Sequence, residues 1–309
     1  MKGVEQNYLY YCLIILSLYN WSCHREIKGI AKENMEQALL LEYTISGGMS
    51  PETFETMRIA SDGQVQVFVG NGWPLGNKIE EVGIYEMTLS EKEINTLQTK
   101  LHRKEVKQAD KSYGKFRPGT MRKKLKISQG KETKEINWPD GEVLPSFLKA
   151  MEKECRKYII KSKDFPRQVI AYEVHLENNK IKQKAQLEGY LKVTNKGQVS
   201  CTLHNGKYGN VSLKYLIKPN GKTLGEEPPL IEIYGLGTTI DWLVNKKEIT
   251  LNPEESFDFA FQIPTTQLKK GSYELFIMTE SEIDANWNGL QESFYVLAIL
   301  PQKKMEIED

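Results

Sequence analysis

The second half of the chain alternates apolar and polar residues with a period of two, the spacing that buries one face of a β-strand. Four runs show the alternation most clearly: Val199–Leu203, Val211–Ile217, Phe257–Phe261 and Tyr273–Ile277. Turn residues separate these runs, and antiparallel sheets with one face on a core show this pattern. We therefore expect residues 169–301 to form an all-β sandwich.

One corner of this region resembles the late strands of immunoglobulin-like modules. The stretch Leu268-Lys269-Lys270-Gly271-Ser272-Tyr273 follows the strand pattern at Phe257–Ile263. In such modules a tyrosine near the start of a strand anchors a corner through its hydroxyl group. The resemblance implies an immunoglobulin-like sandwich, a domain that bacterial lipoproteins often carry, with Tyr273 at its corner. The pattern is also similar, more loosely, to the intracellular proteinase inhibitor family, which is another sandwich.

Residues 38–163 mix helix and strand patterns and are expected to form an α+β module. The predicted elements, in chain order, are a strand over 38–45, a hairpin over 54–60 and 64–70, a helix over 91–103, a hairpin over 120–128 and 132–138, and a helix that begins near Pro145. Ser90 and Glu93 stand at capping-box spacing before the first helix. Residues 164–168 then indicate a linker, and residues 302–309 a polar tail.

The order of these elements resembles a bacterial family of small metalloprotease inhibitors, the protealysin inhibitors (emfourins). Three stretches carry the resemblance, which covers about residues 38–160: Glu42-Tyr43-Thr44-Ile45-Ser46-Gly47-Gly48-Met49, Leu89–Leu101 and Asn137–Leu148. The resemblance implies a fold for the first module and an inhibitory activity toward thermolysin-like proteases. A loop at Trp73-Pro74-Leu75 and a long basic linker depart from the family pattern, and no inhibitory residue of the family is mapped onto this chain.

The first 23 residues are predicted to be an export signal. An apolar run over 8–21 ends at Ser22-Cys23, and it is shorter than the roughly 20 apolar residues of a membrane span. Ser22-Cys23 resembles a bacterial lipoprotein signal, although Asn20 stands where that signal prefers Leu. The resemblance implies a lipid anchor on Cys23 and a place in the cell envelope, with residues 24–37 as a tether. An uncleaved anchor, plain secretion and an N-terminal core helix remain alternatives.

Composition narrows the classes of partner and of chemistry. The formal net charge of +1 favours neither nucleic acid nor an acidic membrane surface. Cys155 and Cys201, which lie outside the leader, are predicted to be buried free thiols, with a bridge between them as the alternative. The sequence has no zinc spacing, nucleophile elbow or phosphate-binding loop, so we expect no cofactor and no catalysis.

Three groups of residues are candidate contacts with another protein. They are the turn Gly47-Gly48, the loop residues Trp73, Pro74 and Leu75, and the basic residues Arg122, Lys124 and Lys126. A loop stiffened by proline suits insertion into a partner's pocket, because stiffness lowers the ordering cost of binding. The basic residues should share one face of a strand, where they would dock an acidic partner or protect a solvated sheet edge by charge.

A fourth candidate is a weak metal site. Asp284, Asn286 and Asn288 precede a glycine as the oxygen donors do in the first half of a calcium loop. Tyr295 stands where that loop would end in a bidentate glutamate. A polar β-turn is the alternative interpretation.

These patterns favour an exported, envelope-attached, lipoprotein-like binding protein without catalysis. Its partner would be another protein, with an extracytoplasmic protease as the specific candidate, and nucleic acid is not expected. One alternative is a ligand- or glycan-binding module that presents Tyr234, Trp242 or Trp287 as stacking platforms. Another is a hydrolase whose site residues are dispersed along the sequence.

Overall fold

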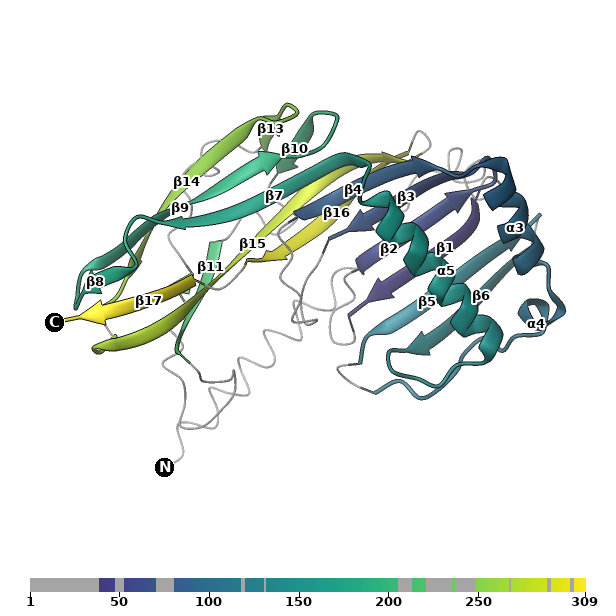
Figure 1. Ribbon diagram of the computed structural model, residues 1–309, viewed down its shortest axis with the longest axis horizontal. Coiled ribbons are helices and arrows are strands. Elements are labelled where there is room, and N and C mark those ends of the chain that lie inside the picture. The colour runs from purple at the N-terminus through teal and green to yellow at the C-terminus, as the bar shows by residue number, and fades with distance from the viewer. Residues whose placement is uncertain are drawn as a thin grey trace, which may run out of the picture. The chain divides into compact units, whose positions relative to one another are not determined.

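The computed structural model describes residues 39–47, 53–70, 81–117, 120–130, 132–204, 213–220, 235–236, 248–266, 268–287, 290–300 and 303–309 (Figure 1). Most of these residues lie in strands of two large sheets, and few lie in helices. The expected fold class is confirmed to this extent: the protein is rich in antiparallel β-structure. The predicted leader and tether, residues 1–37, fall outside the described residues.

The first sheet has nine strands in the order β14-β9-β7-β4-β3-β2-β1-β5-β6, and all its neighbours are antiparallel. Its strands are β1 (Leu39–Ser46), β2 (Thr53–Ala60), β3 (Gln64–Val69), β4 (Glu81–Thr88), β5 (Arg122–Gln129), β6 (Glu132–Pro139), β7 (Pro166–Leu176), β9 (Gln186–Asn195) and β14 (Ser256–Pro264). Both hairpins predicted for the first half are confirmed, as β2–β3 and β5–β6.

The second sheet has eight strands and contains the long hairpin β15–β16. Its strands are β8 (Lys180–Lys182), β10 (Cys201–His204), β11 (Leu213–Pro219), β12 (Gly235–Leu236), β13 (Glu248–Leu251), β15 (Gly271–Trp287), β16 (Leu290–Ile299) and β17 (Lys303–Glu308). Strand β17 pairs with β15 in antiparallel and with β8 in parallel orientation.

The helices begin where local sequence signals place them. Helix α3 (Glu91–Leu101) has the predicted capping box: the Glu93 amide donates to Ser90 Oγ at 3.3 Å, and the Ser90 amide donates to Glu93 Oε2 at 2.9 Å. A short helix, α4 (Lys104–Lys107), follows it. Helix α5 (Ser146–Ser162) has Pro145 as its N-cap, one position earlier than the first-turn position that the sequence favoured.

Helices and the second sheet cover opposite faces of the first sheet. Helices α3 and α5 bury their apolar faces against strands β1 to β6 (Figure 1), in a core that includes Tyr43, Trp138 and Tyr158. The other core lies between the two sheets and includes Tyr172 of β7 and Leu275 of β15. Successive residues of a strand point to opposite faces, so one sheet serves both cores.

The predicted linker and tail are both wrong, because most of each lies in a strand and only residues 164 and 165 of the linker form a turn. Residues 166–168 open strand β7, which pairs with β4 and carries the first sheet without a break into the second half. Residues 37–309 accordingly belong to one compact unit rather than to modules at 38–163 and 169–301. In the tail, Met305 and Ile307 lie in strand β17 and are buried. They alternate with Lys and Glu residues, which is itself a strand pattern.

Two further predictions are confirmed in the core. Cys155 and Cys201 are free and buried. The Tyr273 hydroxyl donates to the carbonyl oxygen of Lys269 at 2.8 Å and holds the corner that precedes β15.

Candidate functional site

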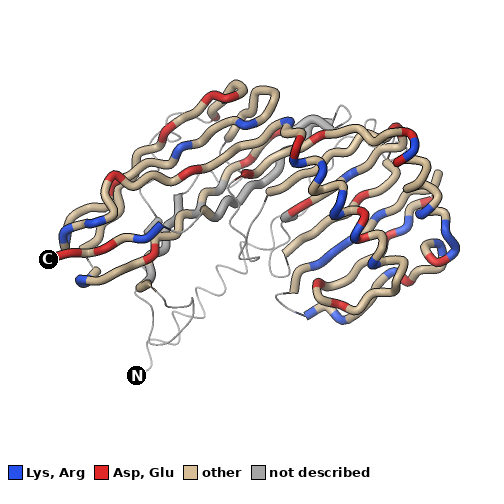
Figure 2. Tube along the Cα trace, in the orientation of Figure 1, with Lys and Arg blue, Asp and Glu red and all other residues tan. Residues whose placement is uncertain are grey.

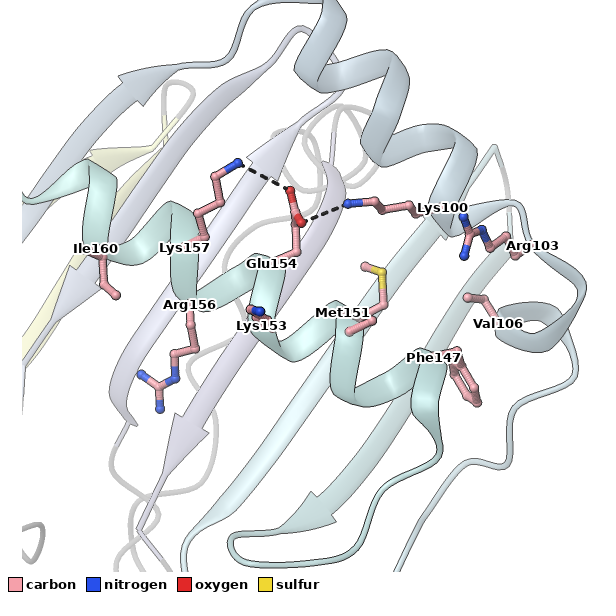
Figure 3. A pocket seen from close by; sticks show the side chains of 11 residues that line it. Lys100, Arg103, Val106, Phe147, Met151, Lys153, Glu154, Arg156, Lys157 and Ile160 are labelled. Carbon is pink, nitrogen blue, oxygen red and sulfur yellow. Dashed lines mark hydrogen bonds and ion pairs between the residues drawn. The ribbon is translucent and has the colours of Figure 1, made fainter.

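A groove of about 630 Å³ runs along helix α5 and is also lined by residues of α3, α4 and the corner between them. We call it the helix groove. Its lining residues are Lys100, Arg103, Val106, Phe147, Ala150, Met151, Lys153, Glu154, Arg156, Lys157 and Ile160. In Figure 3, Glu154 and Lys157 extend from α5 toward α3, whereas Arg156 extends to the other side of α5.

The groove exists because α3 and α5 pack side by side in opposite directions. Glu93 at the start of α3 pairs with Lys161 at the end of α5 at 3.1 Å. Lys100 at the end of α3 pairs with Glu154 near the middle of α5 at 2.9 Å. The chain then turns through α4, so Val106 approaches α5 beyond the end of α3 and closes the groove there.

The floor of the groove is apolar and recessed, and its rim is polar. Val106 is 2% exposed and Met151 is 3% exposed, so both belong to the core beneath the helices as well as to the floor. Ile160, in contrast, is 69% exposed at the far end of the groove. The buried apolar side chains of the floor therefore lie below the charged side chains of the rim.

Cations dominate the rim. Five of the lining side chains are Lys or Arg, and Glu154 is the one acidic residue among them. Along α5 as a whole, cationic positions also outnumber acidic ones (Figure 2). The electrostatic potential of the groove is therefore expected to favour negatively charged groups.

Some of these cations are already neutralised within the protein. Figure 3 shows Lys100 and Lys157 reaching Glu154, at 2.9 Å and 4.0 Å. Partial burial opposes ionisation of Glu154, but the hydrogen bond and charge of Lys100 outweigh it and lower the pKa of this carboxyl group. Arg156 pairs with Glu55 of β2 at 2.7 Å. Within the described residues, Arg103 and Lys153 form no ion pair.

A polar cluster on the sheet side of α5 fixes the helix in place. Lys123 of β5 lies 2.6 Å from Glu152 and 2.5 Å from Asp140, and its side chain is 11% exposed. The Tyr43 hydroxyl donates to the same Glu152 oxygen at 3.2 Å. The hydrogen bond from Lys123 holds the pKa of Asp140 below its usual value, and burial raises the pKa of Tyr43. These groups anchor α5, with one cation shared between two carboxylates.

The three basic residues predicted to share a strand face do so, but on the opposite side of the sheet from the helix groove. Arg122, Lys124 and Lys126 alternate along β5 with Lys123 and the buried Leu125. The alternative that charge protects a sheet edge here is wrong, because β5 pairs with both β1 and β6.

These basic side chains also have aromatic or acidic neighbours within the protein. Arg122 lies over the ring of Phe116 at 5.2 Å, and Lys124 lies 3.8 Å from Glu42. Lys126 is opposite Glu42 on β1 and Glu135 on β6. Alternating charge across neighbouring strands is typical of a solvated sheet face.

The remaining predicted contact residues are only partly described. Gly47 is buried at the end of β1. Gly48, Trp73, Pro74, Leu75 and the lipidation candidate Cys23 lie outside the described residues. Of the three aromatic platforms, Tyr234 and Trp242 also lie outside them, and Trp287 is the last residue of β15.

The calcium-loop pattern falls on a β-hairpin. Asp284 and Asn286 lie in β15, opposite Ser293 and Gln291 of β16, and Asn288 is not described. An extended strand places alternate side chains along a line, whereas a calcium loop folds its donors around the ion. Across the described residues, no three His, Cys, Asp or Glu side chains are grouped as metal ligands.

The helix groove was not predicted, although the sequence contains part of the pattern that forms it. Lys153, Arg156 and Lys157 stand at helical spacing beside the buried face of α5, and the stretch that follows α3 is rich in basic residues. What the sequence does not contain is the packing of α4 against α5, which brings Arg103 and Val106 to the same groove as the basic residues of α5.

Among the described residues, no helix has the length and apolar character needed to span a membrane.

Comparison with known proteins finds only weak similarity to solved structures. No family model and no curated protein matches the chain. The sporulation control protein Spo0M from Bacillus subtilis is 14% identical over 45% of this chain and 49% of its own, with a TM-score of 0.25.

Two other solved structures match at a similar level. A CARDB domain from Pyrococcus furiosus, solved in complex with di-metal ions, is 14% identical over 46% of this chain and 96% of its own, with a TM-score of 0.22. The alkylpurine DNA glycosylase AlkC from Pseudomonas fluorescens is 10% identical over 45% of this chain and 30% of its own, with a TM-score of 0.24. The chain spans about half the length of the Spo0M structure that it matches. Likenesses of this strength carry no statement about function.

Proposed function

We propose that this chain is a non-catalytic binding protein that holds another protein in the helix groove. The observation that carries the proposal is the combination of a recessed apolar floor with a rim of five cations, of which Arg103 and Lys153 form no ion pair with any described residue. Protein contacts draw their affinity from apolar anchors in desolvated pockets and their orientation from charges around them.

The two buried cysteine thiols support a binding role over catalysis by a cysteine nucleophile. Burial raises the pKa of the Cys201 thiol to about 12 and also raises the pKa of the Cys155 thiol. A catalytic nucleophile needs a lowered pKa or an adjacent base, together with access to substrate. Both cysteines instead pack as apolar side chains in the two cores.

We further propose that the protein is exported and anchored to the cell envelope through a lipid on Cys23, with an immunoglobulin-like second half. Support for this comes from the leader sequence and from the Tyr273 corner. The sequence resemblance to the emfourins makes an extracytoplasmic thermolysin-like metalloprotease the specific candidate partner. The mass of the mature N-terminus tests the lipid anchor. Titration of such a protease with the full chain tests inhibition, and no inhibition at micromolar concentration contradicts it.

The contact itself can be tested by site-specific cross-linking in the native cell. A photoreactive phenylalanine derivative replaces Ala150, which lines the groove and is exposed. A matched control carries the same group at Asn95, an exposed residue of α3 outside the groove. We expect a protein adduct from position 150 that is absent from position 95 and is lost when Arg103 and Lys153 are both changed to Glu. Equal adducts at both positions, or none, contradict the proposal.

A further inference from the structure

We infer that the helix groove recognises a short, extended acidic segment of its partner that carries one large apolar side chain. The inference rests on the proposed function and adds the chemistry of the bound segment. It follows from three properties of the groove: the charge that remains after internal pairing, the depth of the floor, and the length of the lined surface.

The first property is positive charge, on two different elements, that no ion pair with a described residue neutralises. Arg103 comes from the corner between α3 and α4, whereas Lys153 comes from α5, and both side chains line the groove (Figure 3). The other three cations share Glu154 and Glu55. Carboxylates of a bound segment would complete the pairing at Arg103 and Lys153, and the planar Arg103 guanidinium suits a carboxylate in a bidentate contact.

The second property is the position of the apolar surface below the charges. Val106 and Met151 are almost fully buried, yet both line the groove. A flat surface such as a bilayer cannot reach a recessed floor, but a side chain that projects from a peptide can. One apolar anchor per segment is therefore the chemistry that fits, and Leu, Met or Phe would fill the space beside Met151 and Phe147.

The third property is length. The lining residues of α5 run from Phe147 to Ile160, which corresponds to roughly 20 Å at the rise of an α-helix. An extended chain covers this distance in about six residues. Nucleic acid fits less well, because single strands are held by stacked aromatic side chains and the floor here is mainly aliphatic.

The test uses the full chain and a fluorescent hexapeptide of Asp and Glu residues with one central Leu, followed by fluorescence anisotropy. We expect saturable binding that weakens as salt rises. Reversing both cations, Arg103→Glu with Lys153→Glu, should weaken binding about tenfold or more, because each loses an attraction and gains a repulsion. The control Lys92→Glu carries the same kind of charge reversal on an exposed α3 residue outside the groove and should leave binding unchanged.

Further arms separate the anchor from the charge. A peptide with Ser in place of Leu should bind more weakly, and a peptide with Lys in place of the acids should not bind. The variant Ala150→Trp fills the groove at an exposed position and should block binding without disturbing the core. Its fold is checked by circular dichroism. Vesicles of anionic phospholipid should not bind to the groove, so their retention must be equal for the wild type and the Ala150→Trp variant.

Several results would overturn the inference. They are the absence of saturable peptide binding, equal binding by the wild type and the double charge reversal, and vesicle binding that depends on the groove. If position 150 cross-links to a protein partner but the acidic peptide does not bind, the proposed function stands and this inference is wrong. If position 150 gives no specific adduct and the peptide does bind, the chemistry of the groove is correct and the partner assignment fails.

Discussion

Val169 and Ile170 are neighbours on strand β7 and both are fully buried, but each belongs to a different hydrophobic core. Val169 packs under the helices, and Ile170 packs between the two sheets. The strand that links the two halves is therefore also the strand that their cores share. Because strand residues alternate between faces, one backbone register serves both cores.

This sharing predicts that the protein unfolds in one cooperative transition. Ile170→Ala should lower the free energy of unfolding by about 3 kcal/mol, and Val169→Ala by a smaller amount. Both substitutions should move the same transition, although they lie in different cores. Urea unfolding followed by circular dichroism and by tryptophan fluorescence is the measurement. Two separate transitions, each moved by one substitution, would show that the halves fold independently.

The capping box gives a prediction with a defined pH window. The backbone and side-chain hydrogen bonds of Ser90, with the contact to Lys161, lower the pKa of Glu93 from 4.5 to about 2. A carboxyl group with a lowered pKa in the folded state contributes stability that is present above its unfolded pKa. That contribution is lost as the pH falls from about 4.5 through about 2.

Ser90→Ala should therefore cost about 1 kcal/mol at neutral pH and reduce the dependence of stability on pH in this window. Thermal unfolding at pH 7, 4.5 and 2.5 is the measurement, with Thr96→Ala on the exposed face of α3 as the control. A pH profile identical to that of the wild type would mean that Glu93 keeps its low pKa without the cap.

Local signals such as this one were predictable, whereas the site was not. Ser90 and Glu93 are three positions apart, and the hairpin turn at residues 61–63 is equally local, so the sequence alone places α3 and β2–β3. Lys100 and Glu154 are 54 positions apart, and their pairing depends on how α5 lies across the sheet. No periodicity encodes that distance, so the helix groove appears only once the elements are packed.

The predicted linker failed for a related reason. Asp164, Pro166 and the polar residues that follow look like a connection between domains. Strand β4, however, would have one unpaired edge if β7 did not pair with it. Pairing between strands that are far apart in sequence decided the outcome. For the same reason, the edge position that was one of two interpretations of the basic residues of β5 belongs to β6 instead.

The anchor of α5 should be sensitive to the loss of one partner and tolerant of the loss of both. Lys123→Met leaves the largely buried Glu152 with the Tyr43 hydroxyl alone, and should cost about 3 kcal/mol of unfolding free energy. The double variant Lys123→Met with Glu152→Met should be less destabilised than Lys123→Met, because the more buried of the two carboxylates that Lys123 contacts is then removed, and the other, Asp140, is 45% exposed and stays solvated. Urea unfolding measures both. Lys153→Ala, on the exposed side of the same helix, should change stability by less than about 0.5 kcal/mol.

The corner at Tyr273 allows the hydroxyl group to be separated from the ring. The side chain is 6% exposed, and its hydroxyl donates to the Lys269 carbonyl at 2.8 Å. Tyr273→Phe keeps the buried ring and should cost about 1 kcal/mol, the net contribution of one hydrogen bond. Tyr273→Ala also removes the ring from the core between the sheets and should cost roughly 3–5 kcal/mol. If Tyr273→Phe leaves the unfolding midpoint unchanged, the hydroxyl does not hold the corner, and the resemblance to immunoglobulin-like modules loses its main structural support.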